Sequence, residues 1–298
     1  MANVYLFGMI VYSTIHRLAG DYPEADGYGE IEETFRVPGG ETGNSALALA
    51  HWGHRVTVEG PHLGSATRAG VLSFLNSRGI DCSLLKYRRA FQGLEDTVLV
   101  GGQTRTVFGR FGGFFRGPRL WARPTPRAVA KADIVGLDPF FAKESEQVAT
   151  LAAKHGKPLV TIDCPPGGRI HRAASVTIVS GEYRRNHHPG APARTLIRRY
   201  ADSGPGLIVF TQGSGPILFC RGSGPVLSER PVATRILSTL GAGDTFRAGV
   251  MQGMLLRHSD REIVRFAAAT SAAVCSRFPF ALDPPGIAEI QALRRRTK

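Results

Sequence analysis

The chain has 298 residues, of which 43% are hydrophobic and 20% are charged, and its formal net charge is +13 at pH 7. This composition is typical of a globular protein and excludes a disordered, collagen-like or coiled-coil chain. The positive charge is compatible with nucleic acid or with a small anionic ligand. No zinc-finger, RRM or KH signature is visible, so nucleic-acid binding is disfavoured as the main function.

The cysteines and the N-terminus point to an ordinary soluble protein. The four cysteines lie far apart and form no CxxC pair, which predicts reduced thiols rather than a disulfide framework or a zinc site. The apolar run from Val4 to Tyr12 follows no basic segment and is shorter than the roughly 18 residues of a membrane span. We interpret it as a first β-strand and expect a cytoplasmic protein.

Strands and helices alternate along most of the chain. A second strand is expected at 30–37, followed by a helix of small apolar residues from Asn44 that stops at Gly53. The pattern predicts further strands at 55–59, 134–137, 159–163, 175–179 and 207–211, and helices at 67–78, 144–154 and 193–202. Such alternation indicates an α/β fold with a mainly parallel central sheet flanked by helices.

One hairpin interrupts this alternation. Residues 97–100 and 104–108 are joined by Gly101-Gly102-Gln103, which predicts a β-hairpin. We therefore expect a single domain over 1–298, with a small β lid built from segments near 11–38 and 95–111. The Arg- and Phe-rich segment 105–123 is interpreted as a solvated loop anchored by aromatic side chains, and an anion-binding or base-stacking surface is the alternative.

The stretch from Ser238 to Phe246 reads STLGAGDTF and precedes a helical run. Small residues at a helix start let backbone amides approach a phosphoryl group, and the helix dipole favours negative charge there. Asp244 could accept the proton of an attacking hydroxyl, although aspartate is also a common helix N-cap.

This stretch resembles the second signature of the ribokinase-like, or PfkB-type, carbohydrate kinases, in which the aspartate is the catalytic base. The resemblance implies Asp244 as the base and an anion hole at Gly241, Ala242 and Gly243. The segment from Gly39 to Asn44 resembles the first signature of the same family, which opens a helix. By that resemblance Gly40 and Asn44 contact the acceptor.

The resemblance extends over nearly the whole chain and implies ATP and Mg²⁺ as cofactors. It assigns Ser180, Thr211, Gly213, Gly215 and Thr239 to the nucleotide side. Within the family, the motifs look most like those of the ketohexokinase branch, which would bring Asp26 to the acceptor from the lid. A solvated turn is the other interpretation of Asp26. Relatives that dimerise through the lid suggest a homodimer.

Three elements of the family pattern are altered. Ser13 stands where an acceptor-binding aspartate is common, so that contact is missing or altered. Ser180 and Tyr183 replace an Asn-x-x-Glu element that organises magnesium, although Glu182 could act through water. Ser238 replaces an aspartate, which puts activation by potassium in doubt.

The sequence leaves the identity of the acceptor open. Glu41 would favour an amine-bearing acceptor, whereas Arg105 would favour one that already carries phosphate. The expected function is ATP-dependent phosphorylation of a hydroxyl on a sugar or sugar-like molecule. The alternatives are a nucleoside kinase of the same family and a degenerate member that binds a sugar or nucleotide as a sensor.

Overall fold

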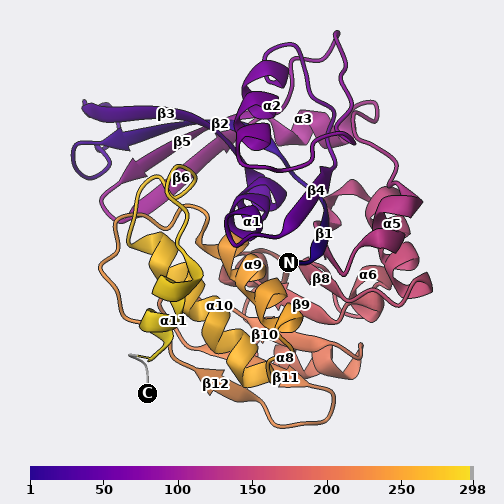
Figure 1. Ribbon diagram of the computed structural model, residues 1–298. Coiled ribbons are helices and arrows are strands. Elements are labelled where there is room, and N and C mark those ends of the chain that lie inside the picture. Colours follow the sequence, from indigo (N-terminus) through magenta and orange to yellow (C-terminus); the bar gives the residue numbers. More distant parts are fainter. Residues whose placement is uncertain (296–298) are drawn as a thin grey trace.

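The computed structural model describes residues 1–295, and their strands form two sheets (Figure 1). The eight-stranded main sheet has the order β12-β11-β10-β9-β8-β7-β1-β4. Its strands are β1 (Asn3–Phe7), β4 (Arg55–Glu59), β7 (Ile134–Leu137), β8 (Leu159–Ile162), β9 (Val176–Val179), β10 (Leu207–Phe210), β11 (Ile217–Arg221) and β12 (Leu227–Glu229). The pairs from β4 to β10 are parallel, and β11 and β12 add antiparallel strands at one edge.

Both faces of the main sheet are buried. Successive side chains of a strand point to opposite faces, and both sets of side chains are covered. In β1, Val4 and Leu6 belong to one hydrophobic cluster, whereas Tyr5 and Phe7 belong to another. A parallel sheet with two buried faces needs helices on each side, and the chain supplies them between the strands.

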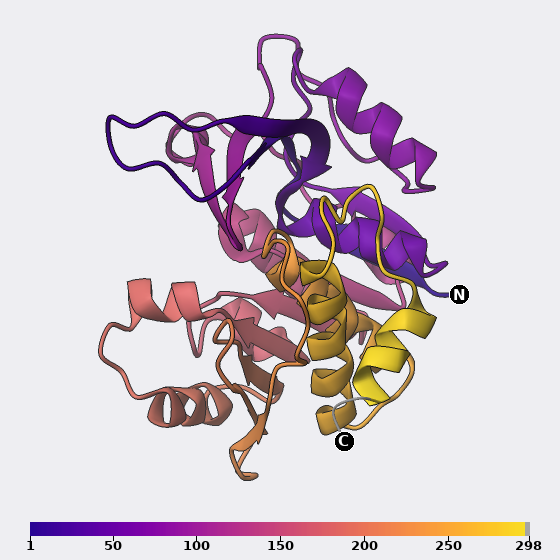
Figure 2. The same ribbon diagram turned by 90° about the vertical axis from the view of Figure 1, so that its left-hand side faces the viewer.

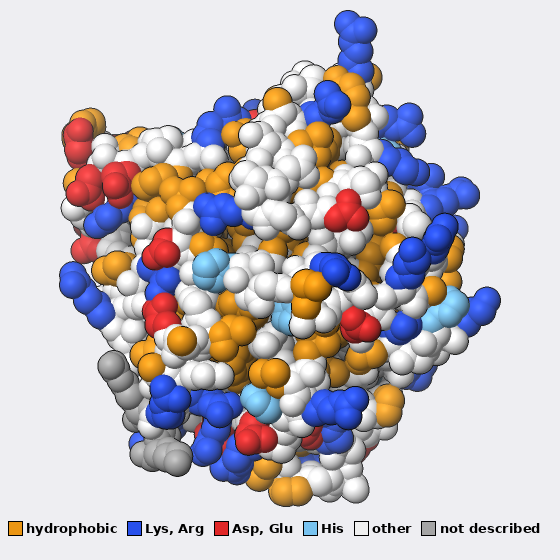
Figure 3. Space-filling model, viewed as in Figure 1, with side chains coloured by type: hydrophobic (Ala, Val, Ile, Leu, Met, Phe, Trp, Pro, Cys, Tyr) orange, Lys and Arg blue, Asp and Glu red, His pale blue; other side chains and the backbone are white. Residues whose placement is uncertain are grey.

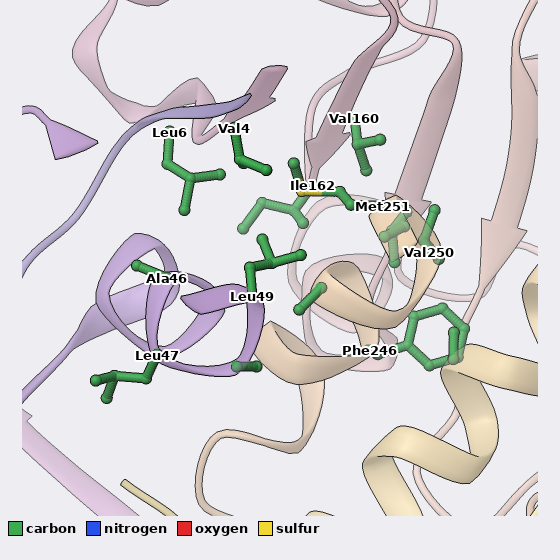
Figure 4. Packing of buried hydrophobic residues seen from close by; sticks show 14 of the residues in the cluster. Val4, Leu6, Ala46, Leu47, Leu49, Val160, Ile162, Phe246, Val250 and Met251 are labelled. Carbon is green, nitrogen blue, oxygen red and sulfur yellow. The ribbon is translucent and has the colours of Figure 1, made fainter. Parts of the chain in front are cut away.

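The helices on the first face are α1 (Gly40–His51), α2 (Arg68–Ser77), α9 (Ala242–Leu255), α10 (Asp260–Cys275) and α11 (Ile287–Arg295). The second face carries α3 (Phe111–Arg116), α4 (Pro126–Lys131), α5 (Lys143–Lys154), α6 (Arg169–Ala173) and α8 (Ala193–Asp202), and the short elements η1 (Pro139–Phe141) and α7 (Gly181–His187) follow β7 and β9. Figure 4 shows side chains of α1 and α9 beside those of β1 and β8 in the first layer. None of the described helices is long and apolar enough to cross a bilayer.

The smaller sheet, called the lid sheet below, has the order β3-β2-β5-β6. Its strands are β2 (Val11–Leu18), β3 (Ile31–Gly39), β5 (Glu95–Gly101) and β6 (Thr104–Gly109). β2 and β5 are parallel neighbours, and β3 and β6 pair antiparallel at the two edges. Figure 2 shows the lid sheet extending from the main body, with the long β2–β3 connection at its tip.

The α/β fold and the β-hairpin are confirmed, but the interpretation of 4–12 as one strand is wrong. The chain leaves the main sheet after Phe7 and enters the lid sheet at Val11. At the break, a Cβ on Gly8 would lie only 1.9 Å from Asp138 Oδ2, so no side chain fits there. The run 4–12 is apolar because the main sheet buries its first part and the lid sheet buries its last part.

The segment 105–123 forms β6 and α3 before it returns to an irregular chain, rather than a loop. Its aromatic side chains anchor it as expected, because Phe114 and Trp121 are buried and their ring centroids lie 5.3 Å apart. Figure 3 shows Lys and Arg side chains spread over the visible face, while acidic side chains gather at the end of the β2–β3 hairpin.

Candidate active site

A cavity of about 350 Å³ lies between the inner face of the lid sheet and the carboxyl ends of the main strands. Ligands of open α/β sheets bind at this edge. The polar groups that line the cavity are Ser13, Glu41, Asn44, Asp96, Arg105 and Asp244, with glycines at 39, 40, 241 and 243. Most of the sequence-predicted acceptor residues therefore meet in one place.

Asp244 and Asn44 come from the two predicted signatures and are directly bonded. The Asn44 side-chain amide donates to Asp244 Oδ2 at 2.7 Å, and the Ser45 hydroxyl donates to the Asp244 backbone carbonyl at 2.8 Å. The two bonds fix the carboxyl group between the start of α1 and the start of α9. They leave the other carboxyl oxygen of Asp244 for a further contact.

The start of α9 is shaped for close approach of an anion. Gly241 has φ +77°, and a Cβ there would lie 2.3 Å from the Phe280 ring. At Gly243 a Cβ would meet no heavy atom within 4 Å, so open space faces this residue. The amides of a first helical turn lack acceptors in a preceding turn and favour negative charge. Of the three predicted amides, that of Ala242 donates to the Thr239 carbonyl at 3.3 Å.

The environment of Asp244 sets its basicity. Burial raises the pKa of its carboxyl group above the ordinary value, and the hydrogen bond from Asn44 opposes this rise. The positive charges of Arg247 and Arg105 also lower this pKa, while the negative charge of Asp138 raises it. A carboxylate with a raised pKa is a better proton acceptor, provided that it is ionised at the working pH.

The acceptor-side turn before α1 requires glycine. Gly40 has φ +79°, and a Cβ there would lie 2.7 Å from the Met9 carbonyl oxygen. The turn places the carboxyl group of Glu41 in the cavity. Burial, followed by the charges of Asp138 and Asp244, raises the pKa of Glu41 to about 8. Glu41 therefore holds a proton over much of the neutral range.

A buried ion pair beneath the cavity was missed from the sequence. Arg247 and Asp138 have fully buried side chains and form a direct ion pair. Asp138 also accepts from the backbone amide of Met9 at 2.7 Å and from the Thr42 hydroxyl at 3.0 Å. Arg247 donates to the Glu41 carbonyl at 2.8 Å. The pair thus ties α9, the end of β7 and the turn before α1 into one unit.

The position of Asp138 in the sequence could have predicted its place in the site. Asp138 directly follows the predicted strand 134–137, and polar side chains at carboxyl ends of parallel strands gather at the ligand edge. Arg247 gave no comparable signal, because a single arginine in a helix is usually exposed.

The lid side of the cavity contributes Ser13, Asp96 and Arg105. Ser13 is buried and lies opposite Asp96 in the register of β2 and β5. Arg105 is exposed on β6, yet its charge still acts on Asp244. Asp96 was missed because the hairpin was predicted to begin one residue later, at Thr97.

Aromatic and aliphatic groups form much of the remaining wall. Phe111 and Phe115 reach the cavity from α3, Phe140 from the end of β7, and Phe280 from the chain after α10. The cavity is therefore polar near Asp244 and largely apolar elsewhere.

Four of the predicted nucleotide residues, Ser180, Thr211, Gly213 and Gly215, follow the carboxyl ends of β9 and β10, whereas Thr239 precedes α9. The amide of Thr211 donates to the Val179 carbonyl at 3.0 Å, which places Thr211 beside Ser180. Gly213 has φ +62° and open space around its Cβ position. Within residues 1–295, the lining of the acceptor cavity does not include Ser180, Thr211, Gly213, Gly215 or Thr239. They are available to a second ligand beyond Asp244.

Ser180 caps α7 and also holds Asp163. Its hydroxyl accepts from the Tyr183 amide at 3.0 Å, and its amide and hydroxyl donate to the Asp163 carboxylate at 2.7 and 2.9 Å. The exposed Glu182 lies close enough to raise the pKa of Asp163. Glu182 is thus on the surface at the start of α7, whereas the Asp163 carboxylate is bonded by Ser180.

Asp26 is not brought to the cavity. It lies in the exposed β2–β3 connection with φ +64°, next to a turn in which Gly27 donates to Glu24. The solvated-turn interpretation describes it, because an aspartate tolerates this left-handed conformation in a tight turn. Its predicted acceptor contact is absent from this arrangement.

A larger groove of about 770 Å³ lies at the amino ends of β1 and β4. It includes none of the residues that surround Asp244, and amino ends are not the ligand edge of such sheets. We therefore place the active site at the smaller cavity.

The family of the chain follows from comparison with known proteins. The model of the family described as "pfkB family carbohydrate kinase" matches residues 1–281. None of the curated proteins matches this chain.

Solved structures show the same fold. A candidate ribokinase from Agrobacterium tumefaciens has a TM-score of 0.86 at 21% identity, with 99% of this chain and 98% of that chain covered. The Arabidopsis thaliana ribokinase complexed with ribose and ATP has a TM-score of 0.79 at 17% identity, covering 99% of each chain. The Burkholderia thailandensis nucleoside kinase in complex with inosine has a TM-score of 0.73 at 16% identity, with 99% and 97% covered.

Proposed function

Since this chain belongs to the PfkB family of carbohydrate kinases, we propose that it transfers the γ-phosphoryl group of ATP to a hydroxyl group of a sugar or sugar-like small molecule. The observation that carries the proposal is the Asp244 carboxyl group, which Asn44 holds at the floor of the cavity beside the open space at Gly243. A base and an anion site are thus adjacent, as phosphoryl transfer requires.

In the proposed reaction, Asp244 accepts the proton of the acceptor hydroxyl while the hydroxyl oxygen attacks the γ-phosphorus in line. The bond from that phosphorus to the β–γ bridging oxygen breaks, and ADP leaves with the electron pair. The amides at the start of α9 stabilise the negative charge that develops on the transferred group. ATP would lie against Ser180, Thr211, Gly213 and Gly215. Bound Mg²⁺ would offset phosphate charge, with Glu182 holding it through water.

A nucleoside is the second candidate acceptor, and the aromatic wall favours it. Phe111, Phe115 and Phe140 offer apolar surface for a base, while Asn44 and Asp244 face the ribose side. The inosine complex of a nucleoside kinase with the same fold adds support. The ketohexokinase-like motifs keep ketoses among the acceptors to test.

We also propose a homodimer through the lid sheet, which rests on the family resemblance, and a cytoplasmic location, which rests on the short N-terminal apolar run. Sedimentation of the purified protein at several concentrations tests the dimer.

The test of function is ATP consumption with Mg²⁺ over a panel of ketoses, aldoses, aminosugars, sugar phosphates and nucleosides. We expect turnover on one subset, and Asp244→Asn should lower kcat by about 10²- to 10⁴-fold, the usual contribution of a general base. Acceptor binding, measured as thermal stabilisation, should remain. A protein that binds ligands but turns over none of the panel would be a sensor rather than a kinase.

Gly243→Ala tests the anion site separately. Because the Cβ position at Gly243 is open, the variant should fold and melt no lower than wild type, and alanine also favours the helix. The methyl group would occupy the space beside the phosphoryl group, so we expect kcat to fall at least tenfold. Full activity in this variant would remove Gly243 from the anion site.

A further inference from the structure

The face of the lid sheet that lines the cavity is mostly aliphatic. Its apolar members are Val11, Ile15, Val37, Val98 and Val107. Only small or charged side chains interrupt this surface, and among them Asp96 stands next to Val98 on β5. A buried carboxyl group on a mostly aliphatic face destabilises the protein unless a donor binds it.

The described protein does not fully satisfy this carboxyl group. Asp96 Oδ1 is buried and has no hydrogen-bond partner within the described residues. The Ser13 hydroxyl lies against the carboxyl group and lowers its pKa, while burial has the larger effect and raises it. A buried acceptor without a donor destabilises the fold that contains it.

Two arginines lie near this carboxyl group, and neither donates to Asp96 Oδ1. Arg36 donates to Glu95 at 2.9 Å, and both side chains are exposed. Arg105 lines the same cavity, where its charge lowers the pKa of Asp244, but no hydrogen bond joins it to Asp96 Oδ1 within the described residues. Asp96 Oδ1 is therefore open to a donor from a molecule in the cavity.

A strip of polar groups connects Asp96 to the base. A Cβ added at Gly39 would lie 2.9 Å from Ser13 Oγ and 3.8 Å from Asn44 Oδ1, so these two groups border the same small space. Asn44 in turn donates to Asp244. A hydroxylated molecule whose reacting hydroxyl lies at Asp244 would extend along this strip towards Asp96.

We propose that Asp96 is a specificity-determining residue whose free Oδ1 accepts a hydrogen bond from the acceptor, from a hydroxyl or amino group other than the hydroxyl that is phosphorylated. This inference rests on the proposed function and names how the acceptor is selected. Asp96 has no part in the proton transfer itself, which belongs to Asp244.

The test compares Asp96→Val and Asp96→Asn with the control Glu95→Gln, the neighbour on the exposed side of β5. Each protein is melted without ligand and assayed with the best acceptor of the panel. For Asp96→Val we expect a melting temperature equal to or above that of wild type. Its acceptor KM should rise about tenfold or more, the loss expected for a charged hydrogen-bond partner. Its KM for ATP and its kcat should change by less than about threefold, and Glu95→Gln should behave as wild type.

The Asp96→Asn variant identifies the donor. Asparagine can still accept from a hydroxyl, so a mild rise in KM indicates a hydroxyl donor, whereas a rise as large as that of Asp96→Val indicates a charged amino group. The corresponding deoxy or deamino analogue should be as poor a substrate for wild type as the parent acceptor is for Asp96→Val.

An unchanged acceptor KM in Asp96→Val would overturn the inference. If the melting temperature also fell, Asp96 would be a structural residue. This result leaves wild-type turnover intact and so differs from failure of the proposed function, in which wild type phosphorylates nothing in the panel.

Discussion

Glu41 shows how a single residue of the site responds to its surroundings. Its carboxyl group lies in the cavity, and both burial and the neighbouring acids Asp138 and Asp244 favour its protonated form. The fold therefore holds a proton on Glu41 that the unfolded chain releases at much lower pH. A group with a raised pKa in the folded state stabilises the fold less as the pH increases.

This gives a prediction for stability against pH. The pKa of Glu41 is 4.5 without perturbation and about 8 in the folded protein. Between these pH values Glu41 is ionised in the unfolded chain but still protonated in the folded protein. Wild type should therefore lose stability relative to Glu41→Gln as the pH rises. Urea unfolding at pH 5, 6, 7 and 8 without ligand measures the difference.

The exposed Glu32 supplies the control, since its side chain sits on the surface of the lid sheet. Glu32→Gln should follow the pH dependence of wild type closely. A wild type that keeps or gains stability relative to Glu41→Gln as the pH rises would contradict the assigned environment.

At the scale of elements, the site is the junction of α1, α9 and the end of β7. Arg247 lies one helical turn after Asp244 and reaches Asp138 at the end of β7, as well as the carbonyl of Glu41 at the start of α1. Arg247 also donates to Ser45, whose hydroxyl in turn donates to the Asp244 carbonyl. Arg247 would therefore position the proposed base, because it holds the Ser45 side chain that is bonded to the Asp244 backbone.

Removing one member of this pair should be costly. Arg247→Met leaves Asp138 buried without its cation, and loss of one partner of a buried ion pair typically destabilises by about 3–5 kcal/mol. Chemical denaturation should show this loss. Arg169→Met, which removes an exposed ion pair with Glu146 of α5, should cost less than about 1 kcal/mol.

The double variant Arg247→Met/Asp138→Leu tests the reason for the loss. If the unpaired charge causes it, the double variant should be more stable than Arg247→Met alone. Equal or lower stability of the double variant would mean that Arg247 stabilises mainly through its bonds to α1.

At the scale of the whole molecule, the sequence predicts the order of elements better than their arrangement. Each strand of the parallel core except β1 was predicted near its bounds, because continuous apolar runs between glycines and helices are characteristic. The two signatures also identified Asp244 and Asn44, which are far apart in sequence but bonded in the fold. The two motifs therefore predicted a pair of side chains that meet in the fold.

Other features depend on contacts that spacing does not encode. The division of 4–12 between two sheets depends on the close approach of Gly8 to Asp138. The place of Asp96 opposite Ser13 depends on the register of two parallel strands that are not neighbours in sequence. β11 and β12 were not predicted, because short antiparallel edge strands give weak patterns.

The lid sheet is assembled from two separate stretches of chain, one containing β2 and β3 and the other containing β5 and β6. Their seam is the parallel pairing of β2 with β5, where Ser13 lies beside Asp96 on the wall of the cavity. Recombination that exchanged one stretch alone would put a foreign partner on the other side of this seam. To transfer a different acceptor preference to this fold, both stretches would therefore have to be exchanged together. A chimaera with a single crossover between them would combine halves of two different binding surfaces.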